Sequence, residues 1–311
     1  MHPHSQHYLL RLFLARAGRA VAAVLVLAVW PVLAGAAPTA GQREALVIGN
    51  AGYETFEPLD NPAHDRADMC DALRQTDFQV TCLADIPDRA SFLARVREFA
   101  ARLGSATSSV FYYAGHAIQV DGENYLVPTR AQLQQPQDIQ AQFVALGEVL
   151  ALLGRNTGRF QLIVLDACRS DPFAAQRRNE NARESRAATA PDSTRQRSLR
   201  VLVSAMQETR TRYGLAAIKD APPGTMVLYA TAADDTAFDG NGRNGPLSKH
   251  LLANIRTRGL GIDELVKRVM DGVRQETKQN YDRAQTPFIY SSFSGNFCFN
   301  CRRPVDLPPT F

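Results

Sequence analysis

The stretch Phe160-Gln-Leu-Ile-Val-Leu165, followed by Asp166-Ala-Cys168, decides the fold class of this 311-residue chain. A short, continuous apolar run of this kind lacks the alternation of a half-exposed strand and is typical of a central strand in a parallel sheet. Such a strand requires helices above and below the sheet, and the flanking sequence supplies both strands and helices to build them.

Strands and helices alternate along the chain on either side of this run. Apolar runs predict strands at residues 43–49, 79–83, 109–113, 160–165, 225–229 and 288–293, and a small hairpin turns at Asp121-Gly122. Helical spacing predicts helices at 61–75, 88–103, 146–153, 246–255 and 262–278. The alternation predicts an α/β sandwich with a mostly parallel sheet.

Composition excludes several classes of protein. The chain is 45% apolar and 21% charged, which rules out a disordered chain, a collagen and a small disulfide-stapled scaffold. Its formal charge of +4 owes three positive charges to residues 1–37, and the rest carries 32 basic against 31 acidic side chains. A nearly neutral chain offers no electrostatic footprint for nucleic acid, and we expect no such partner.

Residues 1–37 have the pattern of a secretory signal peptide. Three arginines precede an uncharged stretch of 14 residues, Ala20–Leu33, which ends at the small-residue sequence Ala34-Gly-Ala-Ala37. A membrane-spanning helix needs roughly 20 apolar residues. We therefore expect an exported protein, periplasmic or secreted, that meets the membrane only transiently; an uncleaved anchor is the alternative.

Five cysteines accompany this leader, and an exported chain can form disulfides. Cys70 and Cys82 bracket a predicted helix-to-strand connection. Cys298 and Cys301 follow a predicted strand near the chain end, and they form either a structural pair or two idle thiols. The odd count leaves at least one free thiol if the others pair.

Residues 174–200 break the alternation of strands and helices. This segment holds seven arginines, three acidic residues and a single large aliphatic residue. It cannot bury an apolar face, so we expect a mobile linker. Its plain interpretation is a solvated insertion.

Cys168 and His116 are the candidate catalytic pair. Each is expected just past a strand, and in a parallel sheet the carboxyl ends of neighbouring strands line one crevice. An imidazole beside a thiol raises the reactive thiolate fraction, by pairing with the thiolate or acting as a base. The sequence Asp166-Ala-Cys168-Arg169, with His116 lying 52 residues upstream, approaches the spacing of the caspase signature. The alternative for a lone cysteine is a packed thiol.

On these motifs the chain resembles the caspase-like cysteine peptidases, which include caspases, metacaspases and bacterial caspase-like proteins. The resemblance covers Arg43 to about Phe299, and its most specific pieces are Tyr113-Ala-Gly-His116, Leu165-Asp-Ala-Cys168-Arg-Ser-Asp-Pro-Phe173 and Asp239-Gly-Asn-Gly-Arg-Asn-Gly-Pro246. It implies a three-layer sandwich with a six-stranded, mostly parallel sheet and helices on both faces. It further implies a peptidase domain at 43–303, a tail at 304–311, Cys168 as nucleophile and His116 as acid and base.

One position departs from the family pattern. The residue after the histidine is usually glycine, whose backbone N–H joins that of the cysteine in the oxyanion hole. Here it is Ala117, which retains the N–H and can donate if the backbone there does not need a positive φ. We expect the N–H groups of Ala117 and Cys168 to form the oxyanion hole.

Asp166 and Asp65 are the predicted substrate-binding residues of the S1 pocket. Asp166 stands two residues before the nucleophile, where caspases have glutamine, and Asp65 resembles an aspartate of the metacaspases. Two carboxylates in one pocket repel each other unless a cation arrives, which favours Arg or Lys at the substrate P1 position. The alternatives are an exposed first-turn acid for Asp65 and a strand-end turn acid for Asp166.

These residues predict a cysteine endopeptidase that cleaves a protein or peptide substrate after Arg or Lys and processes its own Arg-rich linker. The alternative is a weak or silent caspase-like binding or scaffold module. The pattern Gly240-x-Gly-x-x-Gly245 does not follow a strand directly, so a dinucleotide site is not expected. No cluster has zinc spacing, so we expect no metal site and no cofactor; the sequence does not show whether calcium is required.

Overall fold

The computed structural model describes residues 42–104, 108–154, 160–168, 215–216, 221–232, 235 and 237–301. By its internal contacts the chain divides into Met1–Ala37 and Pro38–Phe311. The described residues all belong to the second unit. The predicted signal peptide, the predicted linker at 174–200 and the tail at 304–311 lie outside them.

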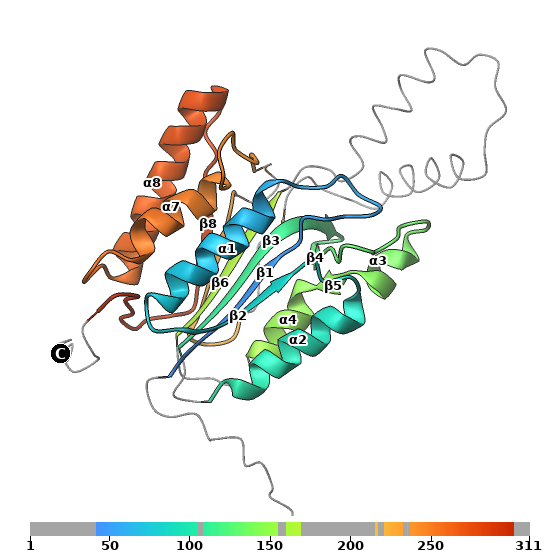
Figure 1. Ribbon diagram of the computed structural model, residues 1–311, viewed down its shortest axis with the longest axis horizontal. Coiled ribbons are helices and arrows are strands. Elements are labelled where there is room, and N and C mark those ends of the chain that lie inside the picture. Colours follow the sequence, from blue (N-terminus) through green and yellow to red (C-terminus); the bar gives the residue numbers. More distant parts are fainter. Residues whose placement is uncertain are drawn as a thin grey trace, which may run out of the picture. The chain divides into compact units, whose positions relative to one another are not determined.

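Six strands of the described chain form a sheet in the order β2-β1-β3-β6-β7-β8 (Figure 1). Their bounds are β1 Arg43–Gly49, β2 Gln79–Ala84, β3 Ser108–Val120, β6 Gln161–Cys168, β7 Thr225–Tyr229 and β8 Phe288–Ser291. All neighbouring pairs are parallel except β7 with the edge strand β8. The fold class predicted from the sequence is therefore confirmed, and the run that starts at Phe160 forms a central strand.

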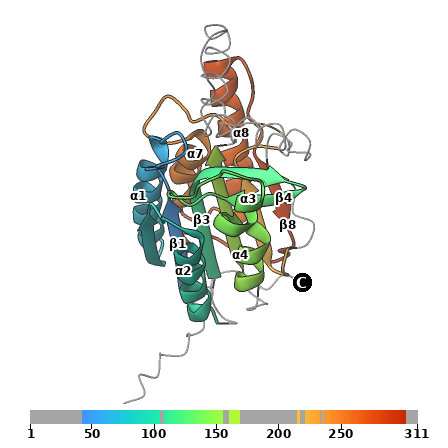
Figure 2. The ribbon, with the colours of Figure 1, turned by 90° about the vertical axis from the view of Figure 1, so that its right-hand side faces the viewer.

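Helices cover both faces of this sheet. Their bounds are α1 Asn61–Arg74, α2 Arg89–Arg102, α4 Leu146–Leu153, α7 Pro246–Ile255 and α8 Ile262–Tyr281. Figures 1 and 2 show α1, α7 and α8 on one face and α2 and α4 on the other. Both faces of the sheet need a cover because successive side chains of β1 point to opposite faces and those of residues 45–48 are all apolar. Ala45 and Val47 belong to the core under α1, α7 and α8. Leu46 and Ile48 belong to the core under α2 and α4.

Local sequence starts these helices where the predictions placed them. The Asp88 carboxylate accepts a hydrogen bond from the Ser91 amide at 2.8 Å and caps α2. Pro62 occupies the first turn of α1, where its missing N–H costs nothing. The sequence did not predict the short helix α3, Gln137–Gln142, which lacks enough apolar residues to show a period.

Strand β3 is longer than predicted, and this changes the position of the candidate site. It has 13 residues and leaves the main sheet to pair antiparallel with β4, Glu123–Leu126, which in turn pairs with β5, Val144–Ala145. His116 therefore lies within β3, and Cys168 is the last residue of β6. The expectation that both residues follow their strands is wrong by a few residues.

Two disulfides form within the described residues. Cys70 of α1 pairs with Cys82 of β2, and Cys298 pairs with Cys301. The alternative of two idle thiols at positions 298 and 301 is wrong. Cys168 is the fifth cysteine, and no other cysteine of this chain is left to pair with it.

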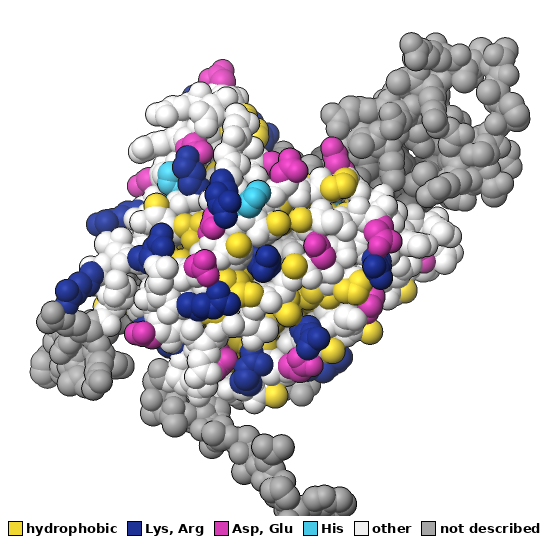
Figure 3. All heavy atoms as spheres, viewed as in Figure 1, with side chains coloured by type: hydrophobic (Ala, Val, Ile, Leu, Met, Phe, Trp, Pro, Cys, Tyr) yellow, Lys and Arg dark blue, Asp and Glu magenta, His cyan; other side chains and the backbone are white. Residues whose placement is uncertain are grey.

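Charged side chains are mixed rather than segregated by sign. On the face shown in Figure 3, Lys and Arg side chains alternate with Asp and Glu side chains over α1 and its surroundings. None of the helices in the described ranges is both long enough and apolar enough to cross a membrane.

Candidate active site

His116 and Cys168 are direct register partners in the parallel ladder between β3 and β6. Neighbouring strands lie about 4.8 Å apart, so the two backbones meet at adjacent positions of the sheet. The site arises because two separate apolar runs pair in the middle of the sheet and end together. The ladder brings together the two residues that the sequence selected as catalytic.

The imidazole of His116 has a defined tautomer. Its Nε2 lies 2.7 Å from the backbone oxygen of Glu57. A carbonyl oxygen only accepts, so Nε2 carries the proton and donates it, and the lone pair is left on Nδ1. Nδ1 is buried and has no hydrogen-bond partner among the described residues. Burial lowers the pKa of His116, and the Glu57 carbonyl opposes this. At neutral pH the residue is a neutral imidazole with a vacant basic nitrogen.

Ala117 can present its N–H without strain. The Val127 amide donates to the His116 carbonyl, which makes residues 116 and 127 a hydrogen-bonded pair of the antiparallel ladder. Since bonded and non-bonded pairs alternate, Ala117 and Leu126 form a non-bonded pair, and the Ala117 N–H points away from β4 toward β6. Ala117 is not among the described residues with positive φ. The substitution of alanine for the family's glycine therefore imposes no backbone penalty here.

Asp65 and Asp166 converge on one glycine from two different elements. A Cβ added to Gly245, the residue before α7, would lie 3.5 Å from Asp65 Oδ2 and 3.4 Å from Asp166 Oδ2. Asp65 is only 2% exposed, although it sits in the second turn of α1, whereas Asp166 is partly accessible. The alternative of a solvent-exposed acid at position 65 is wrong, because the loop before α7 covers it.

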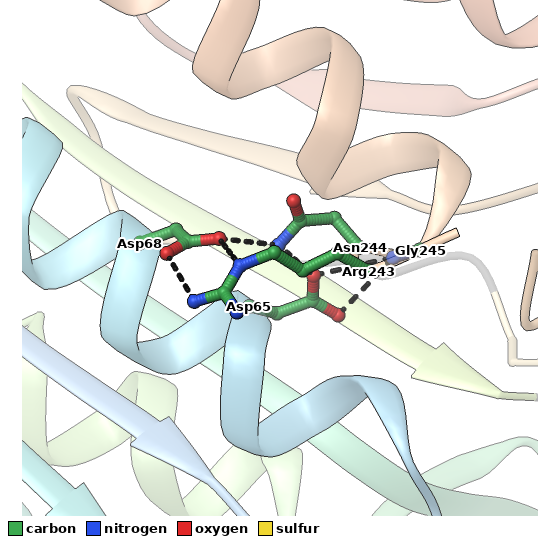
Figure 4. Close-up of polar contacts among 5 residues, drawn as sticks. All are labelled: Asp65, Asp68, Arg243, Asn244 and Gly245. Atoms are coloured by element: carbon green, nitrogen blue, oxygen red, sulfur yellow. Dashed lines mark hydrogen bonds and ion pairs between the residues drawn. The ribbon is translucent and has the colours of Figure 1, made fainter.

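Neutral donors hold Asp65 in place (Figure 4). The Asn244 side-chain amide donates to Asp65 Oδ1 at 2.9 Å, and the Gly245 backbone amide donates to the same oxygen at 3.2 Å. Arg243 pairs with Asp68 through two hydrogen bonds of 2.9 Å each, so the guanidinium lies beside Asp65 without contacting it. The loop is thereby fastened to one face of α1.

Asp166 is held by Ser248 in the first turn of α7. The Ser248 backbone amide and hydroxyl both donate to Asp166 Oδ2, at 3.2 Å and 2.5 Å. The Tyr112 hydroxyl lies 2.5 Å from the same serine oxygen and donates to it when Ser248 donates to the carboxylate. This chain of hydroxyls favours the ionised form of Asp166.

The two carboxyls nevertheless resist ionisation. Burial, followed by repulsion from Asp166, raises the pKa of Asp65 to about 8. Burial also raises the pKa of Asp166 to about 6, and the hydrogen bonds from Ser248 act against it. Near neutral pH the pair therefore holds a proton that a bound cation would displace.

Sequence reasoning missed three residues of this region. The negative charge of Asp239 acts on both His116 and Asp166, although Asp239 lies in an exposed loop. Ser248 and Asn244 supply the donors described above. All three lie within three residues of the glycine-rich stretch 240–245, which carries part of the family resemblance but gave no role to these side chains; its position before a helix was the available signal.

No group of three or more His, Cys, Asp or Glu side chains in the described ranges could hold a metal ion.

Comparison with known proteins places these features in context. A family model described as the caspase domain of the C14 peptidases matches residues 42–298. The human protein called mucosa-associated lymphoid tissue lymphoma translocation protein 1 is 30% identical over 133 residues, which cover 42% of this chain and 16% of that protein. Its mouse homolog is also 30% identical over 133 residues, which cover 42% of this chain and 15% of the mouse protein. The chain thus spans less than a fifth of these two relatives.

Proposed function

This chain belongs to the caspase-domain family of C14 peptidases, and from that premise we propose that it is a cysteine endopeptidase that cleaves after Arg or Lys. One observation carries the catalytic part of the proposal. Cys168 and His116 are register partners on adjacent strands, and the imidazole keeps its vacant Nδ1 while Nε2 is bound to the Glu57 carbonyl.

The reaction follows from this arrangement. His116 Nδ1 takes the proton of the Cys168 thiol, and the thiolate attacks the carbonyl carbon of the scissile peptide bond. The resulting oxyanion accepts hydrogen bonds from the N–H groups of Ala117 and Cys168. The proton on Nδ1 passes to the leaving amine as the peptide C–N bond breaks and leaves a thioester. Water then attacks the thioester, with His116 as base, and restores the thiol.

The preference for a basic P1 side chain rests on Asp65 and Asp166. Their oxygens converge at Gly245, and among the described residues every hydrogen-bond donor to either carboxyl is a neutral group. A guanidinium or ammonium group supplies the missing positive charge, and the planar fork of Arg matches carboxylate geometry better than Lys does. The charge of Asp239, which acts on Asp166, adds to this attraction.

The two disulfides support the proposal that the protein is exported, to the periplasm or the medium. Disulfides such as Cys70–Cys82 persist in oxidising compartments and are rare in a reducing cytosol. This agrees with the signal-peptide pattern of residues 1–37. The arginines of residues 174–200 make that segment a candidate substrate of the same site.

Peptide cleavage tests the proposal directly. Purified protein is incubated with matched peptides that carry Arg, Lys or Asp at P1, and the Cys168→Ala variant serves as the control. We expect cleavage after Arg and Lys by the unmodified protein only. Cleavage after Asp alone would preserve the peptidase and refute the acidic pocket, and no cleavage of any peptide under reducing conditions, with or without calcium, would favour the binding module.

The role of the pocket is tested separately with Asp65→Asn and Asp166→Asn. Each change should reduce kcat/KM for the Arg peptide by at least about tenfold, because it removes one of two charges facing the guanidinium. The mass of the incubated protein reports on self-processing: fragments ending at an arginine of 174–200 are expected, and their absence from an active sample would exclude it.

A further inference from the structure

The backbone of His116 is held by tyrosine hydroxyls. Residues 116 and 127 form a hydrogen-bonded pair in which the regular ladder would join the His116 N–H to the Val127 oxygen. Instead the His116 N–H donates to the Tyr53 hydroxyl at 2.8 Å, and that hydroxyl lies 3.3 Å from the Val127 oxygen and can donate to it. The hydroxyl thus stands in the place of one ladder hydrogen bond.

A second hydroxyl holds the next peptide unit, the one that follows His116. Tyr113 of β3 donates to the His116 carbonyl oxygen at 2.7 Å. The Tyr53 and Tyr113 hydroxyls lie 3.4 Å from each other. Both tyrosines are buried, so these bonds are not weakened by solvent.

The ring of Tyr53 also faces the catalytic imidazole. The two ring centroids are 4.4 Å apart, with the planes inclined at 50°. Tyr53 lies in the connection between β1 and α1, residues 50–60, which we call the histidine loop. The backbone carbonyl of Glu57, four residues further along this loop, accepts a hydrogen bond from the Nε2–H. One loop therefore contacts the backbone, the ring face and the protonated nitrogen of His116.

Gly115 makes room for this arrangement. A Cβ at position 115 would lie 2.6 Å from the Tyr53 hydroxyl and 2.9 Å from the Tyr113 hydroxyl. The φ of Gly115 is +152°, a value that other residues rarely adopt. The approach of both hydroxyls to the backbone of His116 depends on glycine at this position.

We propose that Tyr53 is a positioning residue of the peptidase site, whose hydroxyl fixes the His116 backbone and whose ring stabilises the imidazolium formed when Nδ1 takes the Cys168 proton. The proposal rests on the peptidase function proposed above. The proton moves from sulfur to Nδ1 while Nε2 keeps its own proton and its hydrogen bond to the Glu57 carbonyl, so a positively charged ring forms in a buried place. An electron-rich aromatic face beside a cation offsets the loss of water around it.

Other charges also act on His116 and have to be separated from the effect of Tyr53. They are the carboxylates of Glu57 in the histidine loop and of Asp239 before α7, and both raise the pKa of the imidazole. Neither carboxylate is altered by a change at Tyr53. Admitting water to the site would raise the pKa of His116, because burial lowers it. A fall in the pKa of His116 on substituting Tyr53 therefore reports on the loss of the ring.

The test compares Tyr53→Phe, which removes only the hydroxyl, with Tyr53→Leu, which removes the ring as well. Tyr290→Phe, on the edge strand β8, serves as a matched control. Each change is placed in the full chain with Cys168→Ala, and NMR follows the His116 ring nitrogens and backbone amide across pH. Tyr53→Phe should accelerate hydrogen exchange at the His116 amide and leave the ring titration in place. Tyr53→Leu should lower the pKa of His116 by about half a unit to one unit, on the scale of a buried cation–π contact.

Kinetics on the Arg peptide, with Cys168 present, form the second arm. We expect kcat to fall about tenfold in Tyr53→Phe and about a hundredfold in Tyr53→Leu, with KM nearly unchanged, because misplacing a catalytic group has effects of this size. Unchanged amide exchange in Tyr53→Phe together with an unchanged His116 titration in Tyr53→Leu would overturn the proposal. If Tyr53→Leu does not fold, the amide exchange and kcat of Tyr53→Phe decide. An inactive wild-type protein would count against the peptidase function, and the NMR arm would still decide the role of Tyr53.

Discussion

Raising the pH from 5 to 9 should destabilise this protein through Asp65, and the Asp65→Asn variant should escape most of that loss. Asp65 is buried between α1 and the loop before α7, and its pKa is raised from 3.8 to about 8. Between these two values the folded protein binds more protons than the unfolded chain does. The free energy of unfolding must therefore fall as pH rises through this window.

The magnitude follows from the size of the shift. At about 1.4 kcal/mol per pKa unit, the full shift of Asp65 corresponds to about 6 kcal/mol, which is an upper bound. The ionised carboxylate keeps its hydrogen bonds from Asn244 and Gly245, and water can approach through the partly accessible Asp166. We therefore expect the free energy of unfolding to fall by about 2 to 3 kcal/mol between pH 5 and pH 9.

Urea unfolding at five pH values measures this slope. Both proteins carry Cys168→Ala, which prevents self-digestion during the long incubation. The pKa of His116 is lowered by burial, so its contribution to stability rises with pH, but it is the same in both proteins and cancels in the difference. Asp65→Asn retains an oxygen that can accept from Asn244, so the variant should be at least as stable as its parent at pH 8.

Asp68→Asn is the matched control on the same helix. The hydrogen bonds from Arg243 lower the pKa of Asp68, so its contribution is present at neutral pH and is lost only as pH falls toward the acid range. This variant should be slightly less stable than the parent without a change of slope from pH 5 to 9. Equal slopes for Asp65→Asn and its parent would refute the reasoning, because they would show that Asp65 ionises in the folded protein as easily as in the unfolded chain.

Three further changes follow from the structure. Gly115→Ala should lower the free energy of unfolding by about 3 kcal/mol, because the new Cβ meets the Tyr53 hydroxyl and φ is strained; thermal unfolding measures it, and an unchanged midpoint would contradict the geometry. Ser248→Ala removes a donor that lowers the pKa of Asp166, so kcat/KM for an Arg peptide should fall about tenfold at pH 6 and recover toward pH 8; a uniform loss at every pH would argue against this role. Arg43→Leu removes hydrogen bonds to the carbonyls of Thr76, Cys298 and Phe299 and should cost about 2 kcal/mol in urea unfolding, a loss that Arg43→Lys would recover only in part.

Much of the fold could be predicted because each element carries its own pattern. The apolar run 160–165 and the residues of β1 alternate between two cores. The helices α1 and α2 begin at a proline and at a capping aspartate that the sequence displays. Strand β3 was predicted too short for a physical reason. Its second half contains Gly115 and His116, which lower strand propensity, and it is stabilised by pairing with β4 rather than by its own composition.

The candidate site also has features that the sequence predicts and features that it does not. Spacing and residue type were enough to select His116 and Cys168, since catalysis needs those functional groups wherever they lie. The resemblance to the caspase-like peptidases added Asp65 and Asp166. The burial of Asp65 could not be predicted, because it depends on a loop about 180 positions away in the chain. Asp239, Ser248 and Tyr53 were missed because their roles depend on distances to other elements and not on a sequence period.

By itself the sequence determined the α/β class, the order of most elements and the identity of the two catalytic candidates. These features follow from hydrophobic period and local capping, which act over a few residues. Only the tertiary structure decided which nitrogen of His116 holds the proton, which disulfides form and how strongly burial raises the pKa of the two aspartates. Those outcomes depend on contacts between groups far apart in the chain, where burial and distance set the energies.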